Sequence, residues 1–320
     1  MIGECRKKWR NLLLQSAPAG QCCITVTPQE FFLVYTRQSG DKLVLEFCAS
    51  YPYDRKEGLK DRLSSIVKQY RLKNTNCTWV LAPQDYQLLQ MDVLPVAKNE
   101  FQAAIRWKIK DLLRFSIDDV VIDRFEIPSS KLNPKNNKMV VVASQASYLQ
   151  KTSQDIQEAG LNLSTIDIPE LALRNMMALF EQENQSHALI YIQETMTYLL
   201  ITYQKKLYFI RNLEFGWGEE EKKTEHVEQL AVEIQRSFDY YQNQWREPAP
   251  TQITLASTRF ISQEAIDELS QSLALPVQWL TLDGKLLAKQ EINIEQQGKY
   301  LPIIGELFRK EYENRHATTN

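Results

Sequence analysis

Few side chains in this sequence stand in a pattern that could carry out chemistry. Glu194 lies in a turn between two apolar segments, where a carboxylate could bridge a metal ion or activate water. It has no glycine beside it, and the corresponding earlier turn offers no aspartate partner, so a polar turn residue is favoured. Gly216 and Gly218 form a lone GxG, but the glutamates that follow, Glu219–Glu221, would repel a phosphate. We therefore expect the glycine pair to be a turn that leads into a helix.

No motif of the usual catalytic or metal-binding spacing is present. The histidines are scattered (His187, His226 and His316), and the five cysteines form no CxxC pair, so zinc-ligand spacing is absent. Walker A, GxSxG and HExxH patterns are also missing. We expect no catalytic residue, no metal ion and no cofactor. We expect the cysteine thiols to be reduced, as in a cytosolic protein. Arg236, in the middle of a predicted helix, either joins a surface ion pair or faces a cleft; the ion pair is the default.

The composition is that of an ordinary globular protein with room for two lobes. Of 320 residues, 43% are hydrophobic and 24% are charged. The formal net charge of −2, and the absence of a basic stripe interleaved with aromatic residues, exclude nucleic acid as the expected partner. No apolar run approaches the ~20 residues that span a bilayer, so no transmembrane segment is expected.

The positioning elements occur in the same order twice. Each copy predicts three strands as a meander, then a helix, then a returning strand. This layout is typical of a duplicated α/β core of the actin and sugar-kinase type, whose two lobes face each other across a nucleotide cleft. The predicted elements are 22–26, 31–36, 43–48, 59–70 and 77–81 in the first copy, and 188–192, 198–203, 207–212, 227–245 and 252–256 in the second.

The material between the two copies predicts an inserted α+β subdomain. It contains an amphipathic helix over 99–115 and strands over 86–93, 120–125 and 139–143. Further helices are expected at 147–159, 169–182, 262–273 and 301–312. The expected division is a basic N-terminal helix (1–20), a first lobe (21–168) that includes the insert (83–145), a second lobe (169–312) and a frayed tail (313–320).

The N-terminal segment is basic and then apolar. Four of the five residues from Arg6 to Arg10 are basic, and Leu12–Leu14 follow. The apolar run is too short for a secretory signal. Either the helix docks its leucines on the protein body, which is favoured, or it lies on an anionic membrane surface.

Several short motifs follow one another in a fixed order along the chain. They are Val93-Leu94-Pro95, Ala104–Ile109, Asp118-Asp119-Val120, Ala159-Gly160-Leu161, Val232–Tyr241 and Tyr300–Leu307. Together these segments resemble the PilM and MshI family of actin-like pilus-assembly proteins, and the MshI branch is favoured. The resemblance covers nearly the whole chain, and its specificity comes from the order and spacing of the motifs. More distantly, the chain resembles the cytoplasmic domain of GspL.

The sequence departs from active actin-like ATPases at the nucleotide turns. Those proteins place glycines there so that backbone amides can approach the phosphates. The corresponding turns here, 25–30, 192–197 and 256–259, contain no glycine, and Pro28 lacks an amide hydrogen. The resemblance therefore implies the fold and the partners, whereas ATP binding is disfavoured.

The resemblance implies a non-enzymatic, cytoplasmic scaffold of a type IV or MSHA-like pilus platform. It would reach the inner membrane by binding the cytoplasmic tail of a PilN- or MshJ-like single-span protein, together with other platform components or a second copy of itself. An active actin-like ATPase of a pilus or type II secretion system is the alternative. Large apolar side chains of the insert are the expected partner-binding residues: Phe101, Ile105, Trp107, Ile109 and Phe115.

Overall fold

The computed structural model describes residues 20–39, 42–53, 58–97, 99–129, 137–218, 223–282, 284, 286–288 and 294–309.

The first lobe is built on a sheet whose central strands are buried. Strands β1 (Gly20–Val26), β2 (Glu30–Ser39) and β3 (Lys42–Pro52) form an antiparallel meander. Helix α2 (Leu59–Gln69) then leads to β4 (Asn76–Val80), parallel to β1, and α4 (Ala146–Glu158) leads to β8 (Asn162–Asp167), parallel to β4.

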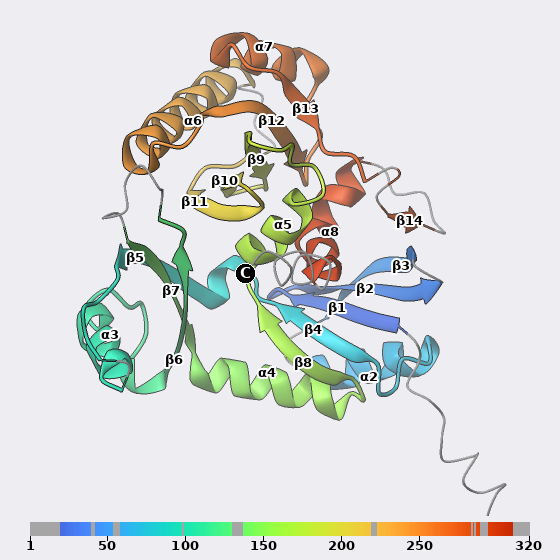
Figure 1. Cartoon of the computed structure of the whole chain (residues 1–320). Helices are drawn as coiled ribbons and strands as arrows, with labels where there is room; N and C mark the ends of the chain where they lie inside the picture. Colours follow the sequence, from blue (N-terminus) through green and yellow to red (C-terminus); the bar gives the residue numbers. More distant parts are fainter. Residues whose placement is uncertain are drawn as a thin grey trace, which may run out of the picture.

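The second lobe repeats this topology (Figure 1). Its sheet has the order β11-β10-β9-β12-β13, which matches β3-β2-β1-β4-β8 strand for strand. The predicted duplication is confirmed by this matching strand order. Each copy also includes one more helix and one more strand than the repeated sequence pattern indicated, α4 and β8 in the first lobe and their counterparts in the second. The elements are β9 (Ser186–Ile192), β10 (Thr197–Tyr203), β11 (Lys206–Leu213), α6 (Lys223–Trp245), β12 (Pro250–Ser257), α7 (Gln263–Leu273) and β13 (Val277–Trp279).

Two helices lie between the sheets and tie the lobes together (Figure 1). Helix α5 (Pro169–Met177) follows the first lobe but packs on β10 and β11, whereas α8 (Ile294–Leu307) follows the second lobe and packs on β1, β2 and β4. The helices also pack on each other, and Gly305 permits the contact because a Cβ there would meet the carbonyl oxygen of Ala172. A short strand, β14 (Leu287–Ala288), adds to the edge of β3.

The insert forms a small sheet with one helix on its outer side (Figure 1). Strands β5 (Tyr86–Asp92), β7 (Lys138–Gln145) and β6 (Val120–Ile127) pair antiparallel in that order. Helix α3 (Phe101–Ile109) packs on one face of the sheet. Two short 3-10 helices, η1 (Pro83–Asp85) and η2 (Ile117–Asp119), join these elements.

Two helix predictions were wrong in length within the insert and α5. The helix predicted over 99–115 ends at Ile109, because the side chain of Gln87 holds the following turn: it donates to the Leu112 carbonyl (3.3 Å) and accepts from the Arg114 amide (2.7 Å). Helix α5 ends at Met177 rather than at 182. Beyond Met177 the chain continues in turns, in which the amides of residues 179–181 donate to the carbonyls of Met176 and Met177. The predicted N-terminal helix (1–20) lies outside the described residues but for Gly20, which begins β1, and the predicted tail (313–320) lies outside them altogether.

The last helix begins at Ile294, earlier than the predicted 301, and it continues through Pro302. A proline inside a helix leaves the carbonyl four residues earlier without its amide partner. Here that carbonyl, of Gly298, accepts a hydrogen bond from the Tyr191 hydroxyl at 2.9 Å. Within the described residues, no helix is both long and apolar enough to cross a membrane.

Candidate functional site

The three turns singled out from the sequence line one cleft between the lobes. The cleft has a volume of about 920 Å³. Thr27, Pro28 and Gln29 come from the turn after β1, and Thr258 and Arg259 come from the loop after β12. The turn after β9 contributes residues 193–196. The cleft of a two-lobed actin-like fold is therefore present, and its walls are the segments that hold nucleotide in active members of that fold class.

Several amides of these turns are used within the chain. The Thr27 amide donates to the Glu30 carbonyl (2.9 Å), and the Glu30 amide donates to the Thr27 hydroxyl (3.2 Å). The Gln193 amide donates to the Met196 carbonyl, and the Thr258 amide donates to the Ile192 carbonyl. A phosphate cradle needs several amides aimed at one point, and each of these bonded amides is lost to such a cradle.

The glycines near the cleft serve packing. A Cβ on Gly298 would collide with the Ser257 carbonyl, so α8 lies directly against the loop after β12. A Cβ on Gly216 would meet the carbonyl oxygen of Gln193, so the GxG segment lies against the turn after β9. The predicted structural role of Gly216 agrees with this contact. Glu194 pairs with Arg259 at 2.8 Å, and no group of three or more metal-ligand side chains occurs among the described residues.

Arg236 lies on the outer surface of α6, with its side chain 67% exposed. Its guanidinium pairs with the Glu233 carboxylate at 2.8 Å, so the surface ion pair favoured from the sequence is present. Glu233 also pairs with Arg211 of β11, whose guanidinium donates to the Ser237 hydroxyl at 2.9 Å. This part of the family motif therefore joins α6 to the edge of the second sheet.

The predicted partner-binding stripe is mostly core, so that prediction needs correction. Phe101, Ile105 and Ile109 are buried against the insert sheet, and Phe115 is half-buried against the same cluster. An apolar stripe at helical spacing faced the nearest sheet, as such stripes generally do. Trp107 alone projects into solvent, with 74% of its surface exposed.

A different apolar groove lies on the opposite face of the insert sheet. In β6, Val120 and Ile122 face α3, so the alternating residues Val121, Asp123 and Phe125 face the other way and line the groove. The first lobe supplies the other wall. The groove has a volume of about 210 Å³ and is lined by Leu81, Val121, Asp123, Arg124, Phe125, Val142, Ser144, Leu149, Ile166, Asp167, Ile168 and Leu171.

Both walls of this groove include a strand at the edge of its sheet. Strand β6 is the edge of the insert sheet and β8 is the edge of the first-lobe sheet, so neither pairs on its outer side with another described strand. Val121 and Ile166, one from each edge strand, are 46% and 40% exposed. Unpaired backbone groups beside exposed apolar side chains can receive an added strand.

A pair of carboxyl groups lies beneath the groove. Asp167 ends β8 and accepts from Arg309 at 3.2 Å, and Glu306 of α8 accepts from the same guanidinium at 3.3 Å. Glu306 is fully buried. Burial, together with the neighbouring charge of Asp167, raises the pKa of Glu306 to about 8. Glu306 therefore keeps its proton at neutral pH, and the Arg309 guanidinium that both carboxyl groups share ties the end of β8 to α8.

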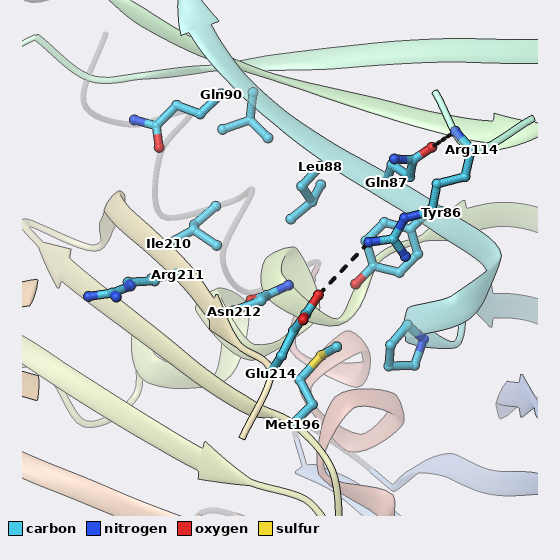
Figure 2. Close-up of a pocket in the computed structure, with 12 residues that line it drawn as sticks. Tyr86, Gln87, Leu88, Gln90, Arg114, Met196, Ile210, Arg211, Asn212 and Glu214 are labelled. Atoms are coloured by element: carbon cyan, nitrogen blue, oxygen red, sulfur yellow. Dashed lines mark hydrogen bonds and ion pairs between the residues drawn. The ribbon is translucent and has the colours of Figure 1, made fainter. Parts of the chain in front are cut away.

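A second, more polar pocket separates the insert from the second lobe (Figure 2). Its volume is about 360 Å³, and β5 and β11 line it. At its base the buried carboxylate of Glu170 accepts from the Tyr86 hydroxyl (2.8 Å) and the Asn212 amide (2.7 Å). Burial raises the pKa of Glu170. Figure 2 shows Arg114 and Glu214 facing each other at the mouth, at 4.0 Å.

The sequence contains a signal for the groove that the predicted partner-binding residues did not include. Strand β6 carries apolar residues at consecutive positions, Val120, Val121 and Ile122, rather than strict alternation. A strand of that kind is typical of a sheet covered on both faces. The partner on the second face cannot be found from the sequence, because β8 lies about forty residues further along the chain.

Comparison with known proteins identifies the family. A family model described as type IV pilus assembly protein PilM matches residues 38–228, well over half of the chain. The chain belongs to the PilM family. No curated protein sequence matches it.

Solved structures agree on the fold. The chain is similar to a protein solved as a PilM–PilN type IV pilus biogenesis complex, with 18% identity and a TM-score of 0.66 over 89% of this chain and 98% of that one. It is also similar to a protein of actin-like ATPase fold and unknown function from Bacteroides thetaiotaomicron VPI-5482, with 10% identity and a TM-score of 0.52 over 89% and 96%. The predicted actin-like fold is confirmed.

Proposed function

We propose that this PilM-family protein is a scaffold whose groove between β6 and β8 binds the cytoplasmic tail of a PilN-like single-span inner-membrane protein. The observation that carries the proposal is the pair of edge strands that wall an apolar groove. A structural relative was solved as a complex with PilN, which supports a partner of this kind. The tail would hold the protein at the cytoplasmic face of the inner membrane, and the MSHA-type branch of pilus systems is the proposed setting.

The groove favours an extended tail over a helix. The groove volume of about 210 Å³ accommodates a few side chains, and the unpaired edges of β6 and β8 offer backbone groups to an extended peptide but not to a helix, whose own backbone groups are already paired. An extended peptide would form main-chain hydrogen bonds with β6 or β8 and insert alternate apolar side chains between Val121 and Ile166. Trp107 is excluded as an anchor of this tail because α3 and the groove lie on opposite faces of the insert sheet.

A charged side chain in the groove is expected to weaken binding of the PilN-like tail. In Ile166→Asp, the carboxylate would lose its hydration when the tail docks, so affinity should fall at least tenfold, about 1.4 kcal/mol. The measurement is a fluorescence-anisotropy titration of a labelled PilN-like tail. Val232→Asp is the matched control, because Val232 is 48% exposed on α6, in the other lobe. Unchanged affinity in a folded Ile166→Asp variant would refute the groove as the site.

We also propose that the cleft takes no nucleotide and that the protein is not an enzyme. The support is the lack of glycine in the three turns and the internal hydrogen bonds of several of their amides. Mg-ATP binding should be no tighter than about 1 mM, which corresponds to about −4 kcal/mol. A thermal-shift titration with Mg-ATP should leave the melting temperature unchanged. A saturable rise in melting temperature would favour the alternative function, an actin-like ATPase.

A further inference from the structure

One carboxylate lies in the apolar groove between β6 and β8 without a basic partner among the described residues. Asp123 lies on the groove side of β6, between Val121 and Phe125, and lines the groove. In the insert sheet it stands opposite Val142 of β7, an apolar residue that also lines the groove. Its Oδ1 atom accepts from the Arg124 amide at 2.8 Å, and within the described part of the chain no side chain forms an ion pair with it.

The other two charged residues that line the groove are already paired. Arg124 turns its guanidinium to the side of the sheet that carries α3, where it pairs with Glu126 at 3.0 Å and lies 3.9 Å from the centre of the Phe101 ring. Asp167 accepts from Arg309 at 3.2 Å. These pairings leave the β6 aspartate as the charge of the groove lining that no described side chain neutralises.

Docking of a tail strand on β6 would take this carboxylate out of water. A carboxylate that loses its hydration without gaining a partner weakens binding, whereas an opposite charge directly across a strand pair strengthens it. Alternate side chains of an extended strand share one face, so the tail residue opposite Asp123 lies two positions from those opposite Val121 and Phe125. The groove therefore fits a peptide with a basic residue that has an apolar residue two positions away on either side.

We propose that Asp123 determines the specificity of the groove and selects tails that carry a lysine or an arginine between two such apolar residues. The inference rests on the proposed function, because it concerns which tail the groove admits. Asp123 pairs with the basic side chain, while Val121 and Phe125 contact the two apolar ones. A wholly apolar or acidic strand is disfavoured, because it brings no partner for the carboxylate of this edge strand. The pattern is symmetrical, so it holds for a parallel and for an antiparallel tail.

The test selects peptides on the full chain from a displayed library of random nonapeptides. Peptides that bind the wild type but not Ile166→Asn are retained, since that change removes an apolar contact of the groove without altering its charge. We expect the retained peptides to share the basic residue with its two apolar neighbours. Selection on Asp123→Lys should give glutamate or aspartate at the same position.

Affinities of the best retained peptide give the size of the effect. Replacing its basic residue by glutamate should weaken binding to the wild type about tenfold, because an attraction across the strand pair is exchanged for a repulsion of similar size. The same replacement should strengthen binding to Asp123→Lys. Fluorescence anisotropy of the labelled peptides measures both values, and circular dichroism confirms that each variant is folded.

The matched control is Glu126→Lys. Glu126 lies on the same strand but on its α3 side, with its side chain 63% exposed, so the change in charge is equal and the groove face is untouched. Its peptide preference should match that of the wild type. Retained peptides without a charge preference, or with the same preference on Asp123→Lys, would overturn the inference and leave the groove as the docking site. If no selected peptide depends on Ile166, the proposed function falls together with the inference.

Discussion

Replacing Trp79 by alanine should cost about 3–5 kcal/mol in the free energy of unfolding. Trp79 lies in β4, between β1 and β8 of the first-lobe sheet, and is fully buried. Its ring meets Tyr148 of α4 edge-on, with centroids 5.7 Å apart, and belongs to the cluster that joins α2 and α4 to the sheet. The indole is one of the largest side chains of that core, so its removal leaves a cavity that the surrounding strands cannot close.

The same substitution at Trp107 provides a matched control. Trp107 is 74% exposed, so Trp107→Ala should change stability by no more than about 0.5 kcal/mol. Urea titrations of both variants, followed by circular dichroism, measure the two values. Similar losses at both positions would contradict the division into a buried first-lobe core and an exposed insert helix.

The second large effect is a loss of stability as the pH rises from 6.5 to 8. The pKa of Glu306 is raised in the folded state from 4.5 to about 8, by burial and by Asp167. The folded protein therefore holds a proton that the unfolded chain has released, and this stabilisation is present below pH 4.5 and lost as the pH approaches 8. The slope is about 1.4 kcal/mol per pH unit near pH 6.5 and about half of that at pH 8, so the loss over the window is somewhat under about 2 kcal/mol.

Glu306→Gln is the variant that isolates this effect, because the amide stays neutral throughout. Its stability should be nearly flat between pH 6.5 and 8, whereas that of the wild type falls. His187 acts in the opposite direction but below the window: burial lowers its pKa to about 4, so its contribution is lost as the pH falls below 6.5. Equal slopes for Glu306→Gln and the wild type would show that another group is responsible.

The repeated core could be predicted from the sequence because its signals are local. Strand β9 is an uninterrupted buried run, and α2 carries Leu59, Leu63, Ile66 and Val67 on one face, so hydrophobic periodicity placed both. The continuation of α8 through Pro302 could not be predicted in this way. It depends on the hydroxyl of Tyr191, more than one hundred residues away, which replaces the missing helical donor.

The candidate site was harder to predict for the same reason. The length of α3 is set by Gln87 of β5, and the groove exists only where β6 and β8, from two different sheets, lie close together. The sequence could indicate that the insert holds a surface for a partner. It could not decide which face of the insert sheet is free, because the stripe of α3 is apolar and two of the outward residues of β6, Val121 and Phe125, are apolar too.

Hydrogen exchange with and without the PilN-like tail tests the central claim most directly. Strand addition would protect backbone amides of β6 or β8, or of both, that have no described strand partner. We predict that the tail slows exchange in residues 120–127 and 162–167 and leaves α3 unchanged. Protection confined to α3, or to β11 and the polar pocket beside it, with none in β6 or β8, would contradict the account.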